Sequence, residues 1–301
     1  MTPRKSYTLA LPGRAPLLLG ERTLVMGIVN VTPDSFTEGG DYLDPVRAVD
    51  RVLALEDAGA DLIDIGGEST RPGAASLSAD EELRRIMPVL ERLDGRVSVP
   101  ISVDTYKGAV ADAALDQGAV MINDISALDY DPTLLGVVSG RGVPIILMHN
   151  RGRSRQMYQK ASYRHVGAEV VEELLATIDR AVKSGVRREQ IVIDPGLGFT
   201  KRADQTTAAL AALPLLKVLD RPVLVGPSRK SFLMAALGDR SPSEREWGTA
   251  GAVAAAVLLG AHIVRVHAVA SHRDVVQVVD AVRAACKAAR PGLEPALCST
   301  L

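Results

Sequence analysis

The sequence has few cysteines, few aromatic residues and no surplus of charge of either sign. Its two cysteines, Cys286 and Cys298, lie near the C-terminus and provide neither a disulfide framework nor the spacing of a metal site. Aromatic residues make up only 3% of the chain, so a core must be built from Ala, Val, Leu and Ile. With 35 basic and 36 acidic residues, the chain has a formal net charge of -1, which argues against nucleic acid or an anionic membrane as a partner.

Long apolar runs are also missing. The longest, residues 250–261, is much shorter than the roughly 20 residues that a membrane helix needs. Pro12, Gly13 and Arg14 interrupt the apolar N-terminus, so we do not expect a signal peptide there. Even so, 47% of the 301 residues are hydrophobic, which is enough to bury a large core. We therefore expect a soluble, cytoplasmic protein whose thiols stay reduced.

Short runs rich in Val and Ile alternate with longer helical patterns between residues 22 and 288. Runs that are apolar on both faces indicate buried strands of a parallel sheet. Gly59, Gly118, Gly185 and Gly260 mark the expected helix ends. Eight strand–helix units in about 250 residues predict a single-domain α/β protein with the (β/α)8 TIM-barrel fold. A doubly wound open sheet is the alternative, although no glycine-rich dinucleotide motif follows any run.

The two ends of the chain fall outside this repeating pattern. Residues 1–21 predict a short N-terminal β-hairpin that plugs one end of the barrel. Residues 22–288 are assigned to the barrel itself, and residues 289–301 predict a flexible C-terminal tail.

Polar side chains follow the predicted strands at their C-terminal ends, where the active sites of such barrels lie. One group combines carboxylate, amide and ammonium functions, namely Asp104, Asn123, Asp194 and Lys230. Buried carboxylates need hydrogen-bond donors. This group therefore suits a flat, nitrogen-rich heterocycle such as a pterin or a purine.

A second group at the same rim is cationic or carries hydroxyls: Arg71, Arg229, Lys230, Arg265 and His267, with Ser69, Thr70 and Ser231. The segment GPSRKS, residues 226–231, is expected to open a helix whose N-terminus favours an anion. Loops after the seventh and eighth strands bind phosphate in many barrels. The rim therefore predicts a heterocycle pocket beside a phosphate pocket.

Several motifs resemble those of the dihydropteroate synthases, a family of pterin-binding barrels, over residues 22–288. They are VNVTPDSF, ADLIDIGGESTRPGA, ISVDT, INDIS, DPGLGF, SRKS and RVH. The resemblance implies an enzyme that joins p-aminobenzoate to 6-hydroxymethyl-7,8-dihydropterin diphosphate and releases pyrophosphate. It also implies Mg²⁺ as cofactor, sulfonamides as competitors of p-aminobenzoate, and a homodimer.

The resemblance also implies roles for individual residues. The catalytic residues would be Asp104, Asp194, Lys230, Arg265 and His267. The pterin would contact Asp104, Asn123, Ile125, Met148, Asp194 and Lys230. The diphosphate would contact Asn30, Arg71, Arg265 and His267, with Asn30 as the metal ligand. The p-aminobenzoate would contact Phe36, Thr70, Pro72, Phe199, Lys230 and Ser231.

The loop at residues 31–41 would be a lid over the bound diphosphate, with Gly39 and Gly40 as hinges and Phe36 as a wall of the aminobenzoate site. Loss of diphosphate from a carbon next to the electron-rich dihydropterin leaves a delocalised cation, so a dissociative path is expected. One departure from the family stands out. Ala268 follows His267 where the family commonly has Asp, and this removes one partner that would orient the imidazole.

Two other functions are compatible with the pattern. A methyltetrahydrofolate-dependent methyltransferase shares the barrel, but it would not need the anion-binding motifs and would have a corrinoid-protein partner. A degenerate paralogue that only binds pterin is the other alternative. Degeneration would erode the polar rim, yet Asn30, Arg71, Asp104 and Lys230 are all present.

Overall fold

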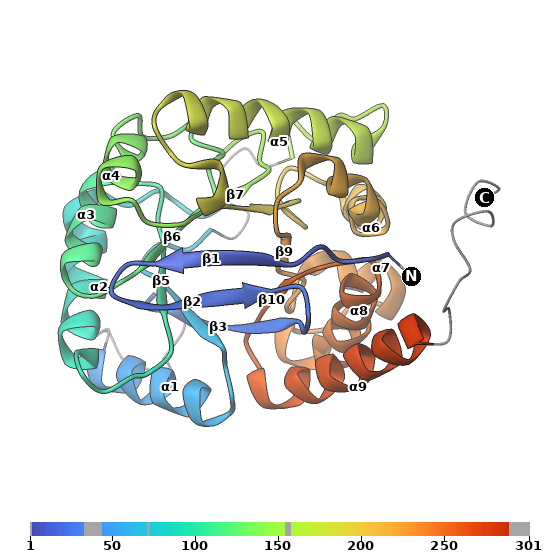
Figure 1. The fold of residues 1–301 in the computed structure, drawn as a ribbon, viewed down its shortest axis with the longest axis horizontal. Coiled ribbons are helices and arrows are strands. Elements are labelled where there is room, and N and C mark those ends of the chain that lie inside the picture. Colours follow the sequence, from blue (N-terminus) through green and yellow to red (C-terminus); the bar gives the residue numbers. More distant parts are fainter. Residues whose placement is uncertain (1, 33–43, 71–72, 154–157, 289–301) are drawn as a thin grey trace.

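A barrel of parallel strands forms the centre of the protein (Figure 1). The computed structural model describes residues 2–32, 44–70, 73–153 and 158–288. The sheet order is β8-β7-β6-β5-β4-β3-β10-β9, and a parallel bridge between Ile193 and Val223 joins its two edges. The predicted (β/α)8 barrel is therefore confirmed. The barrel strands are β3 (Leu24–Asn30), β4 (Leu62–Gly66), β5 (Ile101–Asp104), β6 (Met121–Asp124), β7 (Ile145–Met148), β8 (Ile191–Asp194), β9 (Leu224–Val225) and β10 (Ile263–Val266).

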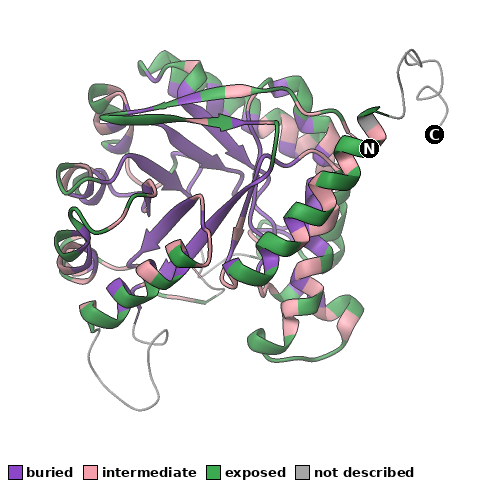
Figure 2. Ribbon diagram, turned by 60° about the horizontal axis from the view of Figure 1, so that its bottom comes forward, coloured by how far each residue is buried: buried purple, intermediate pink, exposed green. Residues whose placement is uncertain are grey.

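Helices surround the barrel, and their outer faces are exposed while the strands are buried (Figure 2). Local sequence explains where several of them begin. Asp44 caps α1 by accepting a 2.8 Å hydrogen bond from the Val46 amide, and Ser78 caps α2 in the same way. The four predicted glycines all have positive φ where a helix has ended. The helices are α1 (Pro45–Asp57), α2 (Ala79–Leu93), α3 (Gly108–Asp116), α4 (Leu134–Arg141), α5 (Val166–Lys183), α6 (Ala203–Ala211), α7 (Met234–Leu237), α8 (Glu246–Leu258) and α9 (Val269–Ala288).

The N-terminal hairpin pairs β1 (Tyr7–Leu11) with β2 (Arg14–Leu19) and lies across the N-terminal ends of the barrel strands (Figure 1). Its inward side chains join the apolar residues of the barrel interior in one buried cluster. The cluster contains Leu9, Leu11, Leu19, Leu24, Met26, Leu62, Val120, Met121, Ile146, Val192, Leu224 and Ile263. The hairpin therefore closes this end of the barrel, as the sequence predicts.

Side chains of a strand alternate between the barrel interior and the surrounding helices. On β4, Leu62 belongs to the interior cluster, whereas Ile63 and Ile65 belong to the layer under the helices. The interior positions therefore recur every second residue, and Asp64 comes next above Leu62. On four other strands, the inward-facing residue of the apolar cluster is likewise followed two residues later by the next inward-facing residue. These pairs are Met121 and Asn123, Ile146 and Met148, Val192 and Asp194, and Ile263 and Arg265. An apolar floor thus supports a layer that is mostly polar.

Two elements are shorter than the sequence suggests. The seventh barrel strand, β9, has only two residues, because Gly226 and Pro227 follow it and proline cannot donate a ladder hydrogen bond. α7 has four residues. Among the described residues, no helix combines the length and the apolarity needed to cross a bilayer.

Candidate active site

Asp64 is the centre of a buried hydrogen-bond network at the C-terminal end of the barrel. One oxygen of its fully buried carboxylate accepts from the Asn123 amide at 2.8 Å and from Nε of Arg265 at 2.7 Å. Arg265 also donates from Nη2 to Asp104 at 2.9 Å. Because a carboxylate only accepts, the Asn123 amide must turn its NH₂ group toward Asp64. Asn123 therefore presents its oxygen elsewhere, as an acceptor.

Two carboxyl groups at this rim, those of Asp104 and Asp194, have raised pKa values. Burial is the largest influence on the pKa of Asp104 and raises it to about 7, while Arg265 opposes the rise and Asp64 adds to it. Burial also raises the pKa of Asp194, against the opposing charge of Lys230. Groups with pKa values shifted in this way gather at functional sites, where charge is matched to a ligand.

The segment between Asp194 and Phe199 forms a second part of the rim. Asp194 accepts a 2.7 Å hydrogen bond from the Gly196 amide, and Lys230 donates to the Leu197 carbonyl at 2.5 Å. The Lys230 ammonium lies 4.6 Å from the centre of the Phe199 ring. Burial lowers the pKa of Lys230 to about 8, although Asp194 opposes the change. The structure thus brings Asp194, Lys230 and Phe199 close together.

Apolar side chains form a small cluster at the same rim. Ile125 and Met148, both expected to contact the pterin, are buried together with Tyr106. Phe199 and Tyr130 pack against them, and the rings of Tyr106 and Tyr130 meet edge to face with centroids 5.1 Å apart. A planar heterocycle could pack against such a cluster while its edge contacts the polar network.

His267 follows β10 at the predicted diphosphate side. Its Nδ1 lies 2.8 Å from the hydroxyl of Ser228, which also accepts the His267 backbone N–H at 3.2 Å. Ser228 therefore orients this imidazole even though Ala268 cannot. Arg229, included in the predicted cationic group, forms an ion pair with Glu246 on α8.

The helix expected after GPSRKS is very short. A 3-10 turn at Ser231–Leu233 leads directly into the four residues of α7. The segment does open a helix, but few peptide dipoles are aligned there, so the macrodipole adds less to anion binding than that of a long helix would. Ser231 itself is exposed at the start of the turn.

The loop after β4 is attached to the barrel by an ion-pair cluster. Lys107 forms ion pairs with Glu68, at the beginning of the loop, and with the buried Glu82 on α2. Tyr106 donates to Glu68 at 3.1 Å. Thr70 lies in this loop. Arg71 and Pro72 lie outside the described residues, as do Phe36 and most of the predicted lid.

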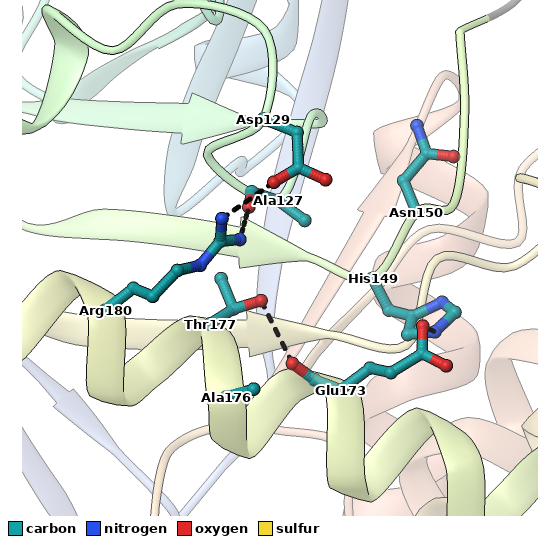
Figure 3. Close-up of a pocket in the computed structure, with 8 residues that line it drawn as sticks. All are labelled: Ala127, Asp129, His149, Asn150, Glu173, Ala176, Thr177 and Arg180. Carbon is teal, nitrogen blue, oxygen red and sulfur yellow. Dashed lines mark hydrogen bonds and ion pairs between the residues drawn. The ribbon is translucent and has the colours of Figure 1, made fainter.

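A hollow of about 270 Å³ lies on the outer side of the rim, between α5 and the loop after β6 (Figure 3). Its lining is formed by Ala127, Asp129, His149, Asn150, Glu173, Ala176, Thr177 and Arg180. None of these is a predicted substrate contact. The hollow also shares no lining residue with the network around Asp64.

The sequence reasoning missed Asp64, Ser228 and Tyr106. Asp64 had one available signal: a carboxylate in an otherwise apolar strand run, two residues beyond the inward-facing Leu62. Ser228 and Tyr106 act through contacts with residues distant in the sequence, so no local pattern identifies them.

Comparison with known proteins agrees with this geometry. The model of the family described as pterin binding enzymes matches residues 26–267. A dihydropteroate synthase of Synechocystis is 44% identical over 87% of this chain and 91% of its own length. The Xanthomonas albilineans dihydropteroate synthase with 4-aminobenzoic acid is 43% identical, with a TM-score of 0.85 over 93% of this chain and 99% of that chain. The Yersinia pestis dihydropteroate synthase in a sulfonamide drug complex is 39% identical, with a TM-score of 0.86 over 92% and 99% of the two chains.

The barrel, its polar rim and the match over most of the chain define a class: the protein belongs to the family of pterin-binding enzymes. Within this family, the relatives place it among the dihydropteroate synthases. This argues against the two alternatives that the sequence left open.

Proposed function

We propose that the protein condenses 6-hydroxymethyl-7,8-dihydropterin diphosphate with p-aminobenzoate, giving 7,8-dihydropteroate and pyrophosphate. The network of Asp64, Asp104, Asn123 and Arg265 carries this proposal. It offers acceptors for ring N–H groups beside a guanidinium that suits a diphosphate. The 4-aminobenzoic acid of the Xanthomonas enzyme and the sulfonamide of the Yersinia enzyme support an arylamine as second substrate and sulfonamides as competitors.

The proposed chemistry is dissociative. The bond between the pterin CH₂ and the bridging oxygen breaks first, and its electron pair leaves with the diphosphate. Arg265 and His267 would stabilise the leaving charge, while Asp104 and Asp194 would stabilise the delocalised cation. The arylamine nitrogen then attacks the CH₂ and loses a proton to solvent or to the diphosphate. An arylamine is already nucleophilic, so this step needs no strong general base.

Asn30, at the end of β3, is the proposed protein ligand of Mg²⁺. Its amide oxygen is a hard donor of the kind that Mg²⁺ accepts, and Mg²⁺ usually combines one or two protein ligands with substrate phosphates and water. Among the described residues, no group of three His, Cys, Asp or Glu side chains could hold a metal ion. The ion would supply positive charge next to the diphosphate.

Release of pyrophosphate tests the reaction. With Mg²⁺ and the pterin diphosphate, release is expected to be fast only when p-aminobenzoate is present, and EDTA should stop it reversibly. Substrate carrying ¹⁸O at the bridging position is expected to scramble its label before any p-aminobenzoate is added. Scrambling that requires p-aminobenzoate would contradict the dissociative path, and release that ignores p-aminobenzoate would contradict the reaction.

We also propose that the protein is a homodimer through α8 and α9. Val278 and Val282 lie one turn apart on α9, with 65% and 50% of their surfaces exposed. On the neighbouring α8, Trp247 is 90% exposed and Leu258 is 36% exposed. An apolar surface of this kind is typical of an interface between subunits.

Mass measurement in solution tests the dimer. Wild-type protein is expected at twice the chain mass of 31.9 kDa, and Val278→Glu with Val282→Glu is expected to shift it to the monomer mass, because buried carboxylates at an interface are costly. Leu18→Glu is the matched control, since Leu18 is equally exposed but lies on β2. A double variant that stays dimeric would place the interface elsewhere.

A further inference from the structure

Lys201 is a buried lysine that the proposed chemistry does not use. It lies two residues after Phe199, the last residue of the segment 194–199, and only 1% of its surface is exposed. An ammonium has three donors and no acceptor, and burying it is costly unless all three are used. The contacts of this side chain therefore indicate what it does.

Three acceptors surround the Lys201 ammonium. It donates to the Gly196 carbonyl at 3.1 Å and to the Phe199 carbonyl at 3.2 Å, and it lies 2.8 Å from Nδ1 of His149. Burial lowers the pKa of Lys201 to about 7, while Asp194 opposes this fall. The charged form, which predominates below about pH 7, has one acceptor for each of its three N–H donors.

His149 is fixed from its other side. Its Nε2 lies 3.1 Å from the Glu173 carboxylate, which faces the ring at the end of the outer hollow (Figure 3). Since Nδ1 accepts from Lys201, Nε2 carries the proton and donates to Glu173. Burial lowers the pKa of His149 to about 4, with the charge of Lys201 as the second cause, which keeps this imidazole neutral.

The segment that Lys201 holds connects the two substrate regions. Asp194 begins it on the proposed pterin side, and Phe199 ends it on the proposed aminobenzoate side. The backbone crosses very close to β7: Gly196 has a φ of +67°, and a Cβ there would lie 2.1 Å from the His149 carbonyl oxygen. Lys230 holds the same segment from the opposite side, through Leu197. In the proposed reaction Lys230 also contacts substrate, whereas Lys201 contacts only groups of the protein.

We propose that Lys201 is a positioning residue that fixes Phe199 as a wall of the aminobenzoate site, acting through the carbonyls of Gly196 and Phe199 and supported by His149. The inference rests on the proposed function. Asp194 is held by its place on β8, which pairs with β7, whereas Phe199 lies beyond that strand and Lys201 donates directly to its backbone carbonyl. Loss of Lys201 should therefore affect the arylamine more than the pterin diphosphate.

Steady-state pyrophosphate release, with each substrate varied in turn, tests this role. Lys201→Met keeps the length of the side chain but removes its donors. It is expected to raise the KM for p-aminobenzoate about tenfold and to change the KM for the pterin diphosphate less than about threefold. Equal increases in both KM values, or no increase in either, would overturn the proposal.

Two substitutions of His149 separate positioning from general packing. His149→Asn offers an amide oxygen near the place of Nδ1, so Lys201 keeps its third acceptor, whereas His149→Leu removes it. Both variants lose the contact with Glu173. The Asn variant is expected to keep a wild-type KM for p-aminobenzoate and the Leu variant to behave like Lys201→Met. Identical behaviour of the two would show that the cluster serves packing alone, and this would overturn the proposal.

Failure of this proposal differs from failure of the proposed function. If wild-type protein does not release pyrophosphate in response to p-aminobenzoate, the function itself is wrong. If wild type does so and the substitutions leave the ratio of the two KM values unchanged, only the role of Lys201 is wrong. Thermal unfolding of every variant identifies any that do not fold.

Discussion

Arg265→Ala is expected to weaken pyrophosphate binding about 100-fold or more and to lower kcat/KM for the pterin diphosphate at least as much. The guanidinium is the proposed contact of the leaving group, and it also lies between the carboxylates of Asp64 and Asp104. Its removal leaves both carboxylates buried without their cation. Breaking a buried pair in this way should lower the free energy of unfolding by about 3–5 kcal/mol.

Calorimetric titration with pyrophosphate and with 6-hydroxymethylpterin measures the loss, and urea unfolding measures the stability. Arg180→Ala is the control arginine, because Arg180 pairs with Asp129 at the outer hollow and should change neither affinity. Adding Asp64→Asn to Arg265→Ala should recover part of the stability but none of the pyrophosphate affinity. An Arg265→Ala protein that binds pyrophosphate like wild type would refute the assignment.

Asp104→Asn is expected to lower the affinity for a pterin by one or two decades at pH 8 and to have much less effect at pH 6. The pKa of Asp104 is raised to about 7, chiefly by burial. Below that pH the carboxyl is mostly protonated and no longer attracts a ring N–H as an anion. Wild-type affinity should therefore fall as the pH falls through 7, whereas the Asn variant should lack this contribution.

Calorimetry with 6-hydroxymethylpterin between pH 5.5 and pH 8.5 measures this difference. The pKa of Asp194 is also raised, and Asp194 titrates in both proteins, so the gap between their two curves isolates Asp104. Asp129→Asn serves as the control carboxylate at the outer hollow. Parallel curves for wild type and Asp104→Asn would show that another group causes the pH dependence.

The regular elements could be predicted because their causes are local. α2 is an example, since Ser78 caps it, acidic residues occupy its first turn and its buried residues recur at helical spacing. The strands follow from short apolar runs, and the polar rim follows from the residues that end them. The lengths of β9 and α7 were harder to predict. Glycine and proline shorten the strand, and no local pattern sets the length of the helix.

The support beneath the rim could not be predicted in the same way. Asp64 is important because Arg265 and Asn123, 201 and 59 residues away in the chain, both donate to it. Lys201 has an acceptor in His149, which follows β7 and is 52 residues away in the chain. Such contacts depend on the register of the whole barrel. The substrate contacts assigned to individual residues, including Arg71, Pro72 and Phe36, stay predictions.

The hairpin closes the N-terminal end of the barrel. The interior is therefore shaped like a cup whose mouth lies at the C-terminal ends of the strands. Its floor is apolar, and Asp64 and Asn123 lie just above that floor, with 0% and 3% of their surfaces exposed. Ser231 is exposed, nearer the mouth. In the proposed reaction the pterin fills the bottom of the cup and the aminobenzoate lies above it, so the second substrate blocks the way in and out for the first. The pterin diphosphate is therefore expected to bind before p-aminobenzoate.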